Sequence, residues 1–288
     1  MSVSLHSDIK LGIVKLKVSD LERSLRFYQE VVGLQILKAD SKLAELTVDG
    51  RHPFLLLEEI PNAHITARRS AAGLYHFAIL LPTRQDLGAS LRNLVQSGIH
   101  IGQADHLVSE ALYITDPDNN GIEIYCDRPR DTWRRDAEGN YIMASDPIDW
   151  DGLLSEASDV PWNGLPVGTT MGHIHFHVKD LSASKRFYCD VLGFDIVADA
   201  SATMRALFIS AGGYHHHIGM NLWAGQDAPV PAPNATGLDY YTIIFPNANE
   251  RALAVQRLQN AGYSVSEQEG ALVVIDPSSI RLRMVSEA

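Results

Sequence analysis

The 288-residue sequence is short of cysteine and of positive charge, and each shortage excludes a class of protein. Its two cysteines, Cys126 and Cys189, are too few for a disulfide framework or a cysteine-based zinc site, and the count is typical of a cytoplasmic protein. With 35 acidic against 24 basic residues, the formal net charge is −11. Nucleic acids and anionic membranes require a basic face, so we expect neither as a partner.

Long apolar runs are also missing. No stretch approaches the roughly 20 apolar residues that cross a bilayer, so we expect no membrane protein. Residues 1–8 contain no basic segment followed by an apolar one, so we expect no signal peptide. Hydrophobic residues make up 45% of the chain and charged residues 20%, which is typical of a globular protein and excludes a disordered or fibrous one.

An internal repeat organises the chain. The motif Val-x-Asp-Leu-x-x-Ser-x-Arg-Phe-Tyr begins at Val18 and again at Val178, and an Asp-Pro pair begins at Asp116 and again at Asp276. Both motifs recur at an offset of 160 residues, which indicates a duplication.

We predict two domains from this repeat, over residues 9–126 and 169–286. Residues 127–168 between them are rich in Asp, Pro, Gly and Trp, and we interpret them as a linker. Two domains also suit the length of the chain.

Each half divides into two units of one strand, one helix and three strands. Apolar residues alternate along 12–18, as in a strand with one buried face. Asp20 is a suitable N-cap for a helix over 21–32, and Gly33 ends that helix. The same plan recurs three times, so we predict an α+β fold of four βαβββ units.

The repeated pattern resembles that of a known superfamily. The sequence Val-x-Asp-Leu-x-x-Ser-x-x-Phe-Tyr-x-x-x-Leu-Gly, closed by Asp-Pro-x-x-Asn-Gly-Ile-Glu, is similar to the vicinal oxygen chelate superfamily of glyoxalases, bleomycin-resistance proteins and type I extradiol dioxygenases. The resemblance implies two tandem glyoxalase-like domains whose curved mixed sheets enclose a metal cavity. One fold serves several reactions, so the site must be argued from its residues.

Histidines gather on one face of the strand predicted over residues 172–178. Side chains alternate along a strand, so His173, His175 and His177 share the face opposite the apolar set that packs on the helices. Ordinary polar residues on an open face are the alternative explanation.

A histidine and a glutamate lie on two further strands. In the strand over 75–81, Tyr75 belongs to the apolar face and His76 to the other, where a hydrogen bond to a backbone carbonyl could also explain the histidine. Glu123 lies between two isoleucines. Burying its charge unpaired is costly, and a metal ion would supply the missing positive charge.

The resemblance implies metal ligands on the first and last strands of a unit. His76 and Glu123 occupy these positions in the second unit, and His173 occupies the first in the third unit. We therefore expect one metal site per chain, formed by the second and third units facing each other, with His175 as the alternative to His173. The first and fourth units offer Ile13, Tyr240 and Arg281 at these positions, so their site has decayed.

Further pocket residues also follow from the resemblance to extradiol dioxygenases. His216, within Tyr214-His215-His216-His217, matches the acid–base histidine, with His215 as its neighbour; a solvated polar turn is the alternative. Which of the three histidines points inward stays open. Tyr113, ten residues before Glu123, matches a tyrosine that donates a hydrogen bond to substrate, although tyrosine is also common in strands. His106 matches a further pocket histidine.

The resulting hypothesis is a cytoplasmic extradiol dioxygenase that cleaves catechol or a substituted catechol with O₂. Two histidines and one carboxylate are the ligand set of non-haem Fe(II) oxygenases, although Mn²⁺ or Zn²⁺ also suit it. Relatives in the superfamily commonly form homo-oligomers, so we expect one here.

Two alternatives come from other function classes. A glyoxalase-type isomerase or lyase with Zn²⁺, Ni²⁺ or Mn²⁺ would use two carboxylates among four protein ligands, and the arginine expected at the second carboxylate position counts against it. A metal-free binding protein would leave Glu123 and the histidines without a role.

Overall fold

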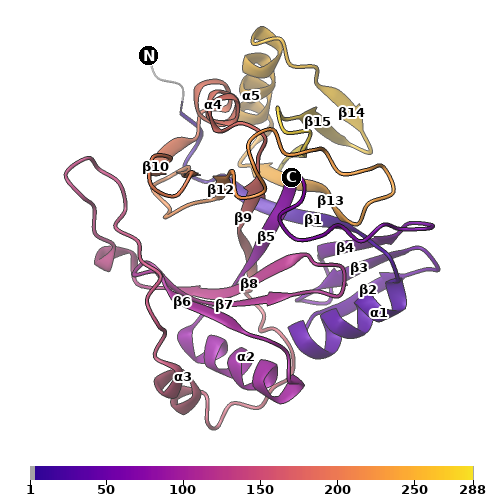
Figure 1. Ribbon diagram of the computed structural model, residues 1–288, viewed down its shortest axis with the longest axis vertical. Helices are drawn as coiled ribbons and strands as arrows, with labels where there is room; N and C mark the ends of the chain where they lie inside the picture. The colour runs from indigo at the N-terminus through magenta and orange to yellow at the C-terminus, as the bar shows by residue number, and fades with distance from the viewer. Residues whose placement is uncertain (1–3, 288) are drawn as a thin grey trace.

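The computed structural model describes residues 4–287, so the segment considered for a signal peptide is only partly covered. The strands form two mixed sheets of eight strands each (Figure 1). The first unit contains β1 (Lys10–Val18), α1 (Leu21–Arg26), η1 (Phe27–Val32), β2 (Gln35–Ala39), β3 (Leu43–Thr47) and β4 (Pro53–Glu59). The second contains β5 (Gly73–Leu80), α2 (Arg84–Ser97), β6 (Gly102–Asp105), β7 (Ser109–Thr115) and β8 (Gly121–Asp127).

The second half repeats this order of elements. The third unit contains β9 (Thr170–His177), α4 (Leu181–Lys185), η3 (Arg186–Leu192), β10 (Asp195–Ala200), β11 (Ala206–Ser210) and β12 (Ile218–Asn221). The fourth contains β13 (Gly237–Phe245), α5 (Ala248–Asn260), β14 (Ser266–Gln268), β15 (Ala271–Ile275) and β16 (Arg281–Ser286). The segment between the halves contains η2 (Arg130–Thr132) and α3 (Trp150–Glu156). The prediction of an α+β fold with four βαβββ units is confirmed.

The repeated motif encodes the start and end of each helix. The Asp20 side chain accepts a hydrogen bond from the backbone N–H of Arg23, which caps the first helix, and Asp180 caps its counterpart in the same way. Gly33 then ends the helical segment with φ at 94°, a left-handed conformation that favours glycine.

The same motif joins neighbouring units within each half. The hydroxyl of Tyr28 donates a hydrogen bond of 2.9 Å to Asp116, and that of Tyr188 donates one of 3.0 Å to Asp276. Each pair is buried, and each links the Phe-Tyr motif of one unit to the Asp-Pro turn of the next. The two motifs of the repeat are thus halves of one interaction.

The sheets do not follow the halves of the sequence. One sheet has the strand order β14-β15-β16-β13-β1-β4-β3-β2, and the other β10-β11-β12-β9-β5-β8-β7-β6. We call them the outer-unit sheet and the inner-unit sheet, because they combine units one and four, and units two and three. Their central pairs, β1 with β13 and β5 with β9, are antiparallel. Figure 1 shows both pairs near the middle of the molecule.

The two faces of the inner-unit sheet have different neighbours. Phe77 and Ile79 of β5 are fully buried in the main hydrophobic core, which includes residues of both sheets and of the helices. Ala78, between them in sequence, instead packs with Ala111 and Tyr125 in a small separate cluster. This second face carries the candidate site residues.

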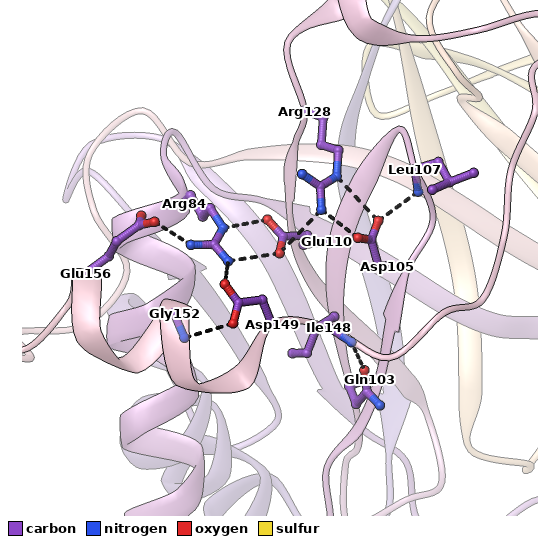
Figure 2. Close-up of polar contacts among 10 residues, drawn as sticks. All are labelled: Arg84, Gln103, Asp105, Leu107, Glu110, Arg128, Ile148, Asp149, Gly152 and Glu156. Carbon is purple, nitrogen blue, oxygen red and sulfur yellow. Dashed lines mark hydrogen bonds and ion pairs between the residues drawn. The ribbon is translucent and has the colours of Figure 1, made fainter.

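The linker is bound along the second unit. Arg84 of α2 forms ion pairs with the buried Glu110 of β7 and with two acidic residues of the α3 segment, Asp149 and Glu156 (Figure 2). Arg128 pairs with Asp105 at 2.5 Å. The linker therefore has a defined path over the edge of the inner-unit sheet. In the described range 4–287, no helix combines the length and the apolar character of a membrane span.

Candidate metal centre and its cavity

Three buried side chains with metal-binding atoms converge on the inner-unit sheet. Glu123 Oε2 lies 3.1 Å from His76 Nε2 and 3.0 Å from His173 Nε2. The two histidine Nε2 atoms are 3.4 Å apart. All three residues are at least nine-tenths buried, and they come from three adjacent strands, β5, β8 and β9.

Strand register explains why these side chains meet. Ala78 of β5 pairs with Glu123 on the parallel strand β8 and with His173 on the antiparallel strand β9. His76 precedes Ala78 by two residues and therefore shares its face. The three ligand candidates thus surround the small side chain of Ala78, which leaves space between them.

The electrostatics of the cluster match the protonation states that a metal requires. Burial lowers the pKa values of His76 and His173, which favours their neutral forms. Burial alone would raise the pKa of Glu123, but the adjacent His173 and His76 outweigh this and hold it well below its usual range. A neutral pair of imidazoles with an ionised carboxylate is ready to bind a cation.

The donor distances also fit a divalent metal ion. Ligand bonds of about 2.1 Å at angles between 90° and 110° place two donor atoms about 3.0 to 3.4 Å apart. The distances of 3.0, 3.1 and 3.4 Å lie in this range. His173 Nδ1 is buried without a hydrogen-bond partner, so the ring directs only Nε2 at the cluster. Elsewhere in residues 4–287, no other such group of three His, Cys, Asp or Glu residues is found.

The cluster opens into a cavity of about 600 Å³. His76 and Glu123 line it, and Tyr75, Phe208 and Trp223 form an aromatic wall. The linker contributes further lining residues, among them Asn140, Tyr141, Met143 and Ala144. The linker therefore lines the candidate site, whereas the sequence alone indicated only a connection between the two halves.

Tyr75 corrects the prediction from strand alternation, which put it on the apolar face. A register irregularity between Leu74 and His76 interrupts the alternation at this point of β5. The Tyr75 ring consequently lies 5.0 Å from the His76 ring and 5.2 Å from the His175 ring, on the cavity side.

His175, the alternative to His173, has a different partner. Its Nε2 accepts a hydrogen bond of 2.9 Å from the Asn221 side-chain amide, and the oxygen of that amide lies 2.6 Å from His177 Nδ1. The His175 ring lines the cavity without joining the three-residue cluster. Sequence reasoning did not identify Asn221, which orients both histidines.

The three consecutive histidines before β12 have separate surroundings. His216 lines the cavity, and burial holds its pKa well below the usual range. His215 is fully buried and lies between Asp127, at 3.0 Å, and His216, at 2.8 Å. His217 Nδ1 accepts a hydrogen bond from the Ala211 backbone, and burial lowers its pKa to about 3.

Tyr113 and His106 form a hydrogen-bonded pair on the cavity wall. Tyr113 of β7 is the direct cross-strand neighbour of Glu123, and burial raises the pKa of its hydroxyl. The Tyr113 hydroxyl lies 2.6 Å from His106 Nε2, and His106 Nδ1 donates to the Ala144 carbonyl at 2.6 Å. Because Nδ1 carries the hydrogen, Nε2 of a neutral His106 accepts from Tyr113.

The outer-unit sheet corrects another expectation. Thr242 of β13 corresponds to Ala78, and it pairs with Arg283 rather than with Arg281. Arg283 therefore occupies the position equivalent to Glu123, with Tyr240 equivalent to His76. Arg281 instead pairs with Asp239 at 2.7 Å. An arginine still stands where a second carboxylate would be needed.

Sequence comparison finds one matching family model and several relatives. The model of the Glyoxalase/Bleomycin resistance protein/Dioxygenase superfamily matches residues 10–124 and 170–272. The chain is 55% identical over 276 residues to the catechol-2,3-dioxygenase of Bacillus subtilis (strain 168), covering 96% of each chain. It is 30% identical over 120 residues to biphenyl-2,3-diol 1,2-dioxygenase 3 of Rhodococcus globerulus, covering 41% of this chain and 63% of that protein.

Solved structures with low sequence identity share the fold. A putative dioxygenase from Bacillus subtilis matches with a TM-score of 0.66 at 11% identity, covering 98% of this chain and 86% of that chain. Glyoxalase I from Zea mays matches with a TM-score of 0.55 at 16% identity, covering 97% and 92%. Both isomerase-type and dioxygenase-type proteins thus have this architecture, so the likeness does not distinguish between reactions.

Proposed function

Because the chain belongs to the Glyoxalase/Bleomycin resistance protein/Dioxygenase superfamily, we propose that the His76–Glu123–His173 cluster is the metal centre of an extradiol dioxygenase. The substrate is catechol or a substituted catechol, and the metal is Fe(II). The observation that carries the proposal is this buried cluster at the base of an aromatic-walled cavity. The 55% identity to a catechol-2,3-dioxygenase supports the reaction class.

Three protein ligands on one side of a metal leave positions for other molecules. A divalent metal held by these residues would bind both catechol oxygens and lower the pKa of a hydroxyl, as metals do for bound water. The two histidines and the carboxylate are typical of Fe(II) oxygenases, and the same donors also suit Mn²⁺ or Zn²⁺.

His216 accepts the proton that the substrate releases. Its ring borders both the cavity and His173, with ring centroids 4.1 Å apart, so it lies beside the place where the substrate oxygens would be held. Its Nδ1 is hydrogen-bonded to His215, so Nε2 is the atom available to take the proton.

Tyr113 orients the substrate from the opposite wall. The Tyr113 hydroxyl lies 2.6 Å from His106 Nε2, which holds it at the cavity wall, where it donates to an oxygen of the bound substrate. A donor fixed in this way stabilises negative charge that develops on that oxygen. Since burial raises the pKa of Tyr113, its hydroxyl keeps the hydrogen at neutral pH.

The aromatic wall holds the substrate ring and excludes water. Tyr75, Phe208 and Trp223 present faces and edges on which a ring packs. In the overall reaction, the ring bond beside the diol breaks and both atoms of O₂ enter the product, a hydroxymuconic semialdehyde. The chain's contribution is to position the ring, hold the proton at His216 and hold the substrate oxygen with Tyr113.

The alternative functions have less support from the site. A glyoxalase-type enzyme needs a second carboxylate ligand, and in the described part of the chain Glu123 is the one carboxylate of the cluster. A metal-free binding protein would bury an ionised Glu123 among histidines for no purpose, which is costly.

The experiment is anaerobic loading of the purified protein with Fe(II), followed by catechol and air. We expect a yellow ring-cleavage product and matching O₂ uptake near pH 7. A parallel assay measures consumption of the hemithioacetal of methylglyoxal and glutathione. Iron bound in a 1:1 ratio without colour or O₂ uptake would contradict the dioxygenase, and hemithioacetal turnover would replace it with an isomerase.

A further inference from the structure

Two polar residues lie behind the cavity: the fully buried His215, which enters the proposed function only as the hydrogen-bond partner of His216, and the partly exposed Asp127, which has no part in it. Asp127 is the last residue of β8, and His215 lies in the loop before β12. The fully buried His215 ring does not line the cavity, and its Nε2 lies 3.0 Å from Asp127 Oδ1. Residues 88 positions apart are thus joined by one charge-assisted hydrogen bond.

The hydrogen bonds define which nitrogen carries each hydrogen. A carboxylate only accepts, so His215 Nε2 carries the hydrogen of that ring and its Nδ1 is an acceptor. His215 Nδ1 lies 2.8 Å from His216 Nδ1, which must therefore donate. The hydrogen of His216 is then on Nδ1, and its Nε2 is left as an acceptor. His216 Nδ1 is hydrogen-bonded to His215, whereas His216 Nε2 has no hydrogen-bond partner within residues 4–287.

The surroundings keep this arrangement in place. The Tyr214 hydroxyl donates to the same Asp127 oxygen at 3.2 Å, and the hydroxyls of Tyr125 and Tyr214 are 2.6 Å apart. Trp133 of the linker covers His215, with ring centroids 5.2 Å apart. The His215 ring is therefore held by Asp127, Trp133 and His216. These contacts oppose rotation of the ring.

We infer that Asp127 and His215 are positioning residues for His216: the Asp127 carboxylate fixes the hydrogen of His215 on Nε2, and His215 thereby leaves His216 Nε2 free to accept the substrate proton. The role in turnover rests on the proposed dioxygenase function, whereas the hydrogen-bond arrangement does not. A similar carboxylate–histidine pair orients the base in serine hydrolases, where loss of the carboxylate charge traps the wrong tautomer.

The outer-unit sheet provides a matched control. The repeat offset of 160 residues makes Glu287 the counterpart of Asp127. Glu287 is exposed and pairs with Lys10 at 2.7 Å, far in sequence from any of these histidines. A change at Glu287 removes a carboxylate from the same place in the repeat without touching His215.

The first test reads the hydrogen positions directly and needs no turnover. In metal-free protein with ¹⁵N-labelled histidine, NMR couplings between ring nitrogens and carbon-bound protons should show His215 with hydrogen on Nε2 and His216 with hydrogen on Nδ1. Asp127→Ala should convert both rings to mixtures of tautomers, whereas Glu287→Ala should not. A wild-type His216 with its hydrogen on Nε2 would overturn the inference, and so would an unchanged pattern in Asp127→Ala.

The second test measures kcat and KM of the Fe(II)-loaded enzyme with catechol. We expect Asp127→Ala to lower kcat about 10- to 100-fold, a range typical of partners that orient functional histidines, with KM within about 3-fold of the wild type. Asp127→Glu, which keeps an acceptor, should recover most of kcat. Equal losses in Asp127→Glu and Asp127→Ala, or a kcat for Asp127→Ala within 2-fold of wild type, would overturn the inference. Lack of turnover in the wild type would instead contradict the proposed function, and the NMR result would still decide the hydrogen-bond arrangement.

Discussion

The inner-unit and outer-unit sheets have the same strand plan but differ in the partners of their charged side chains. Each sheet pairs one unit from either half of the chain through an antiparallel central pair. At equivalent positions, the inner-unit sheet has His76 and Glu123, whereas the outer-unit sheet has Tyr240 and Arg283. The Arg283 guanidinium lies 4.6 Å from the centre of the Tyr240 ring, where an aromatic face attracts a cation.

The charges of the outer-unit sheet are satisfied within the chain. Lys15 pairs with Glu58 at 2.6 Å and with Asp239 at 3.2 Å. Burial alone would lower the pKa of Lys15, but these two carboxylates outweigh it and raise the pKa. In the inner-unit sheet, the partners of Glu123 are neutral imidazoles, so its negative charge has no full positive counterpart in the protein. The proposed metal ion would supply this positive charge on the inner-unit sheet, whereas the outer-unit sheet supplies it with its own side chains.

The strongest test of this difference removes the charge of Glu123. Glu123→Gln keeps the shape of the side chain but loses the anionic ligand, so we expect iron retention and turnover to fall by about 100-fold or more. Arg283→Met, at the equivalent position of the outer-unit sheet, should keep both. Iron per chain and O₂ uptake with catechol are the measurements. An active, iron-loaded Glu123→Gln enzyme would remove Glu123 from the ligand set.

A smaller loss is expected when the cavity loses one hydroxyl. Tyr113→Phe keeps the ring beside Glu123 but removes the donor shared between His106 and the substrate, and we expect kcat to fall about 10- to 100-fold with iron still bound. Tyr240→Phe removes a hydroxyl from the outer-unit sheet and should leave kcat unchanged. Steady-state kinetics of both variants is the check. Equal kcat in Tyr113→Phe and wild type would exclude this donor role.

The buried histidines also make stability depend on pH. Burial lowers the pKa of His217 to about 3, while an unfolded histidine has a pKa near 6.5. Between these values the unfolded chain binds one more proton at this residue, so the free energy of unfolding falls as pH falls, by about 1.4 kcal/mol per pH unit. His217→Gln should therefore flatten the pH dependence by about this amount between pH 6 and pH 5.

Urea unfolding of the metal-free protein at these two pH values measures the change. His100→Gln replaces an exposed histidine and should keep the wild-type dependence. If His217→Gln showed the same pH dependence as wild type, the buried ring would not be neutral in the folded state.

The fold could be predicted because the residues of the repeated motifs contact one another in the structure. The Phe-Tyr and Asp-Pro motifs recur together since Tyr28 bonds to Asp116 and Tyr188 to Asp276. The helix caps at Asp20 and Asp180 are equally local. Such interactions lie within a unit or between consecutive units, so the sequence alone reveals the four βαβββ units.

The pairing of units could not be derived in the same way. Four similar units have similar strand edges, and the motifs do not distinguish which edges meet. The hypothesis of a site shared by units two and three rested on the positions of the histidines, and the sheet order places those units side by side. The contacts of Asp127 with His215 and of Ala144 with His106 join residues that are far apart in sequence. No repeated motif links the two members of either pair.

Local irregularities limited the remaining assignments. Alternation put Tyr75 on the wrong face because a register shift in β5 has no signature in the sequence. Counting along an arginine-rich strand selected Arg281 where the pairing of β13 with β16 selects Arg283. The Tyr75 error exchanges the two faces of a strand, as a shift of one residue does, whereas the arginine error is a shift of two residues along one face.

The smallest expected effect concerns the stability of the outer-unit sheet. Arg283 packs on Tyr240 and pairs with Glu269 at 3.2 Å, so Arg283→Met loses a cation–aromatic contact and an ion pair with an exposed partner. We expect a loss of about 1 kcal/mol, because such contacts are individually weak. The thermal midpoint of the metal-free protein should fall by about 2–4 °C, while iron content stays constant. A loss of iron together with stability would show that the outer-unit sheet supports the metal centre through the shared core. The charged side chains of the two sheets would then be coupled rather than independent.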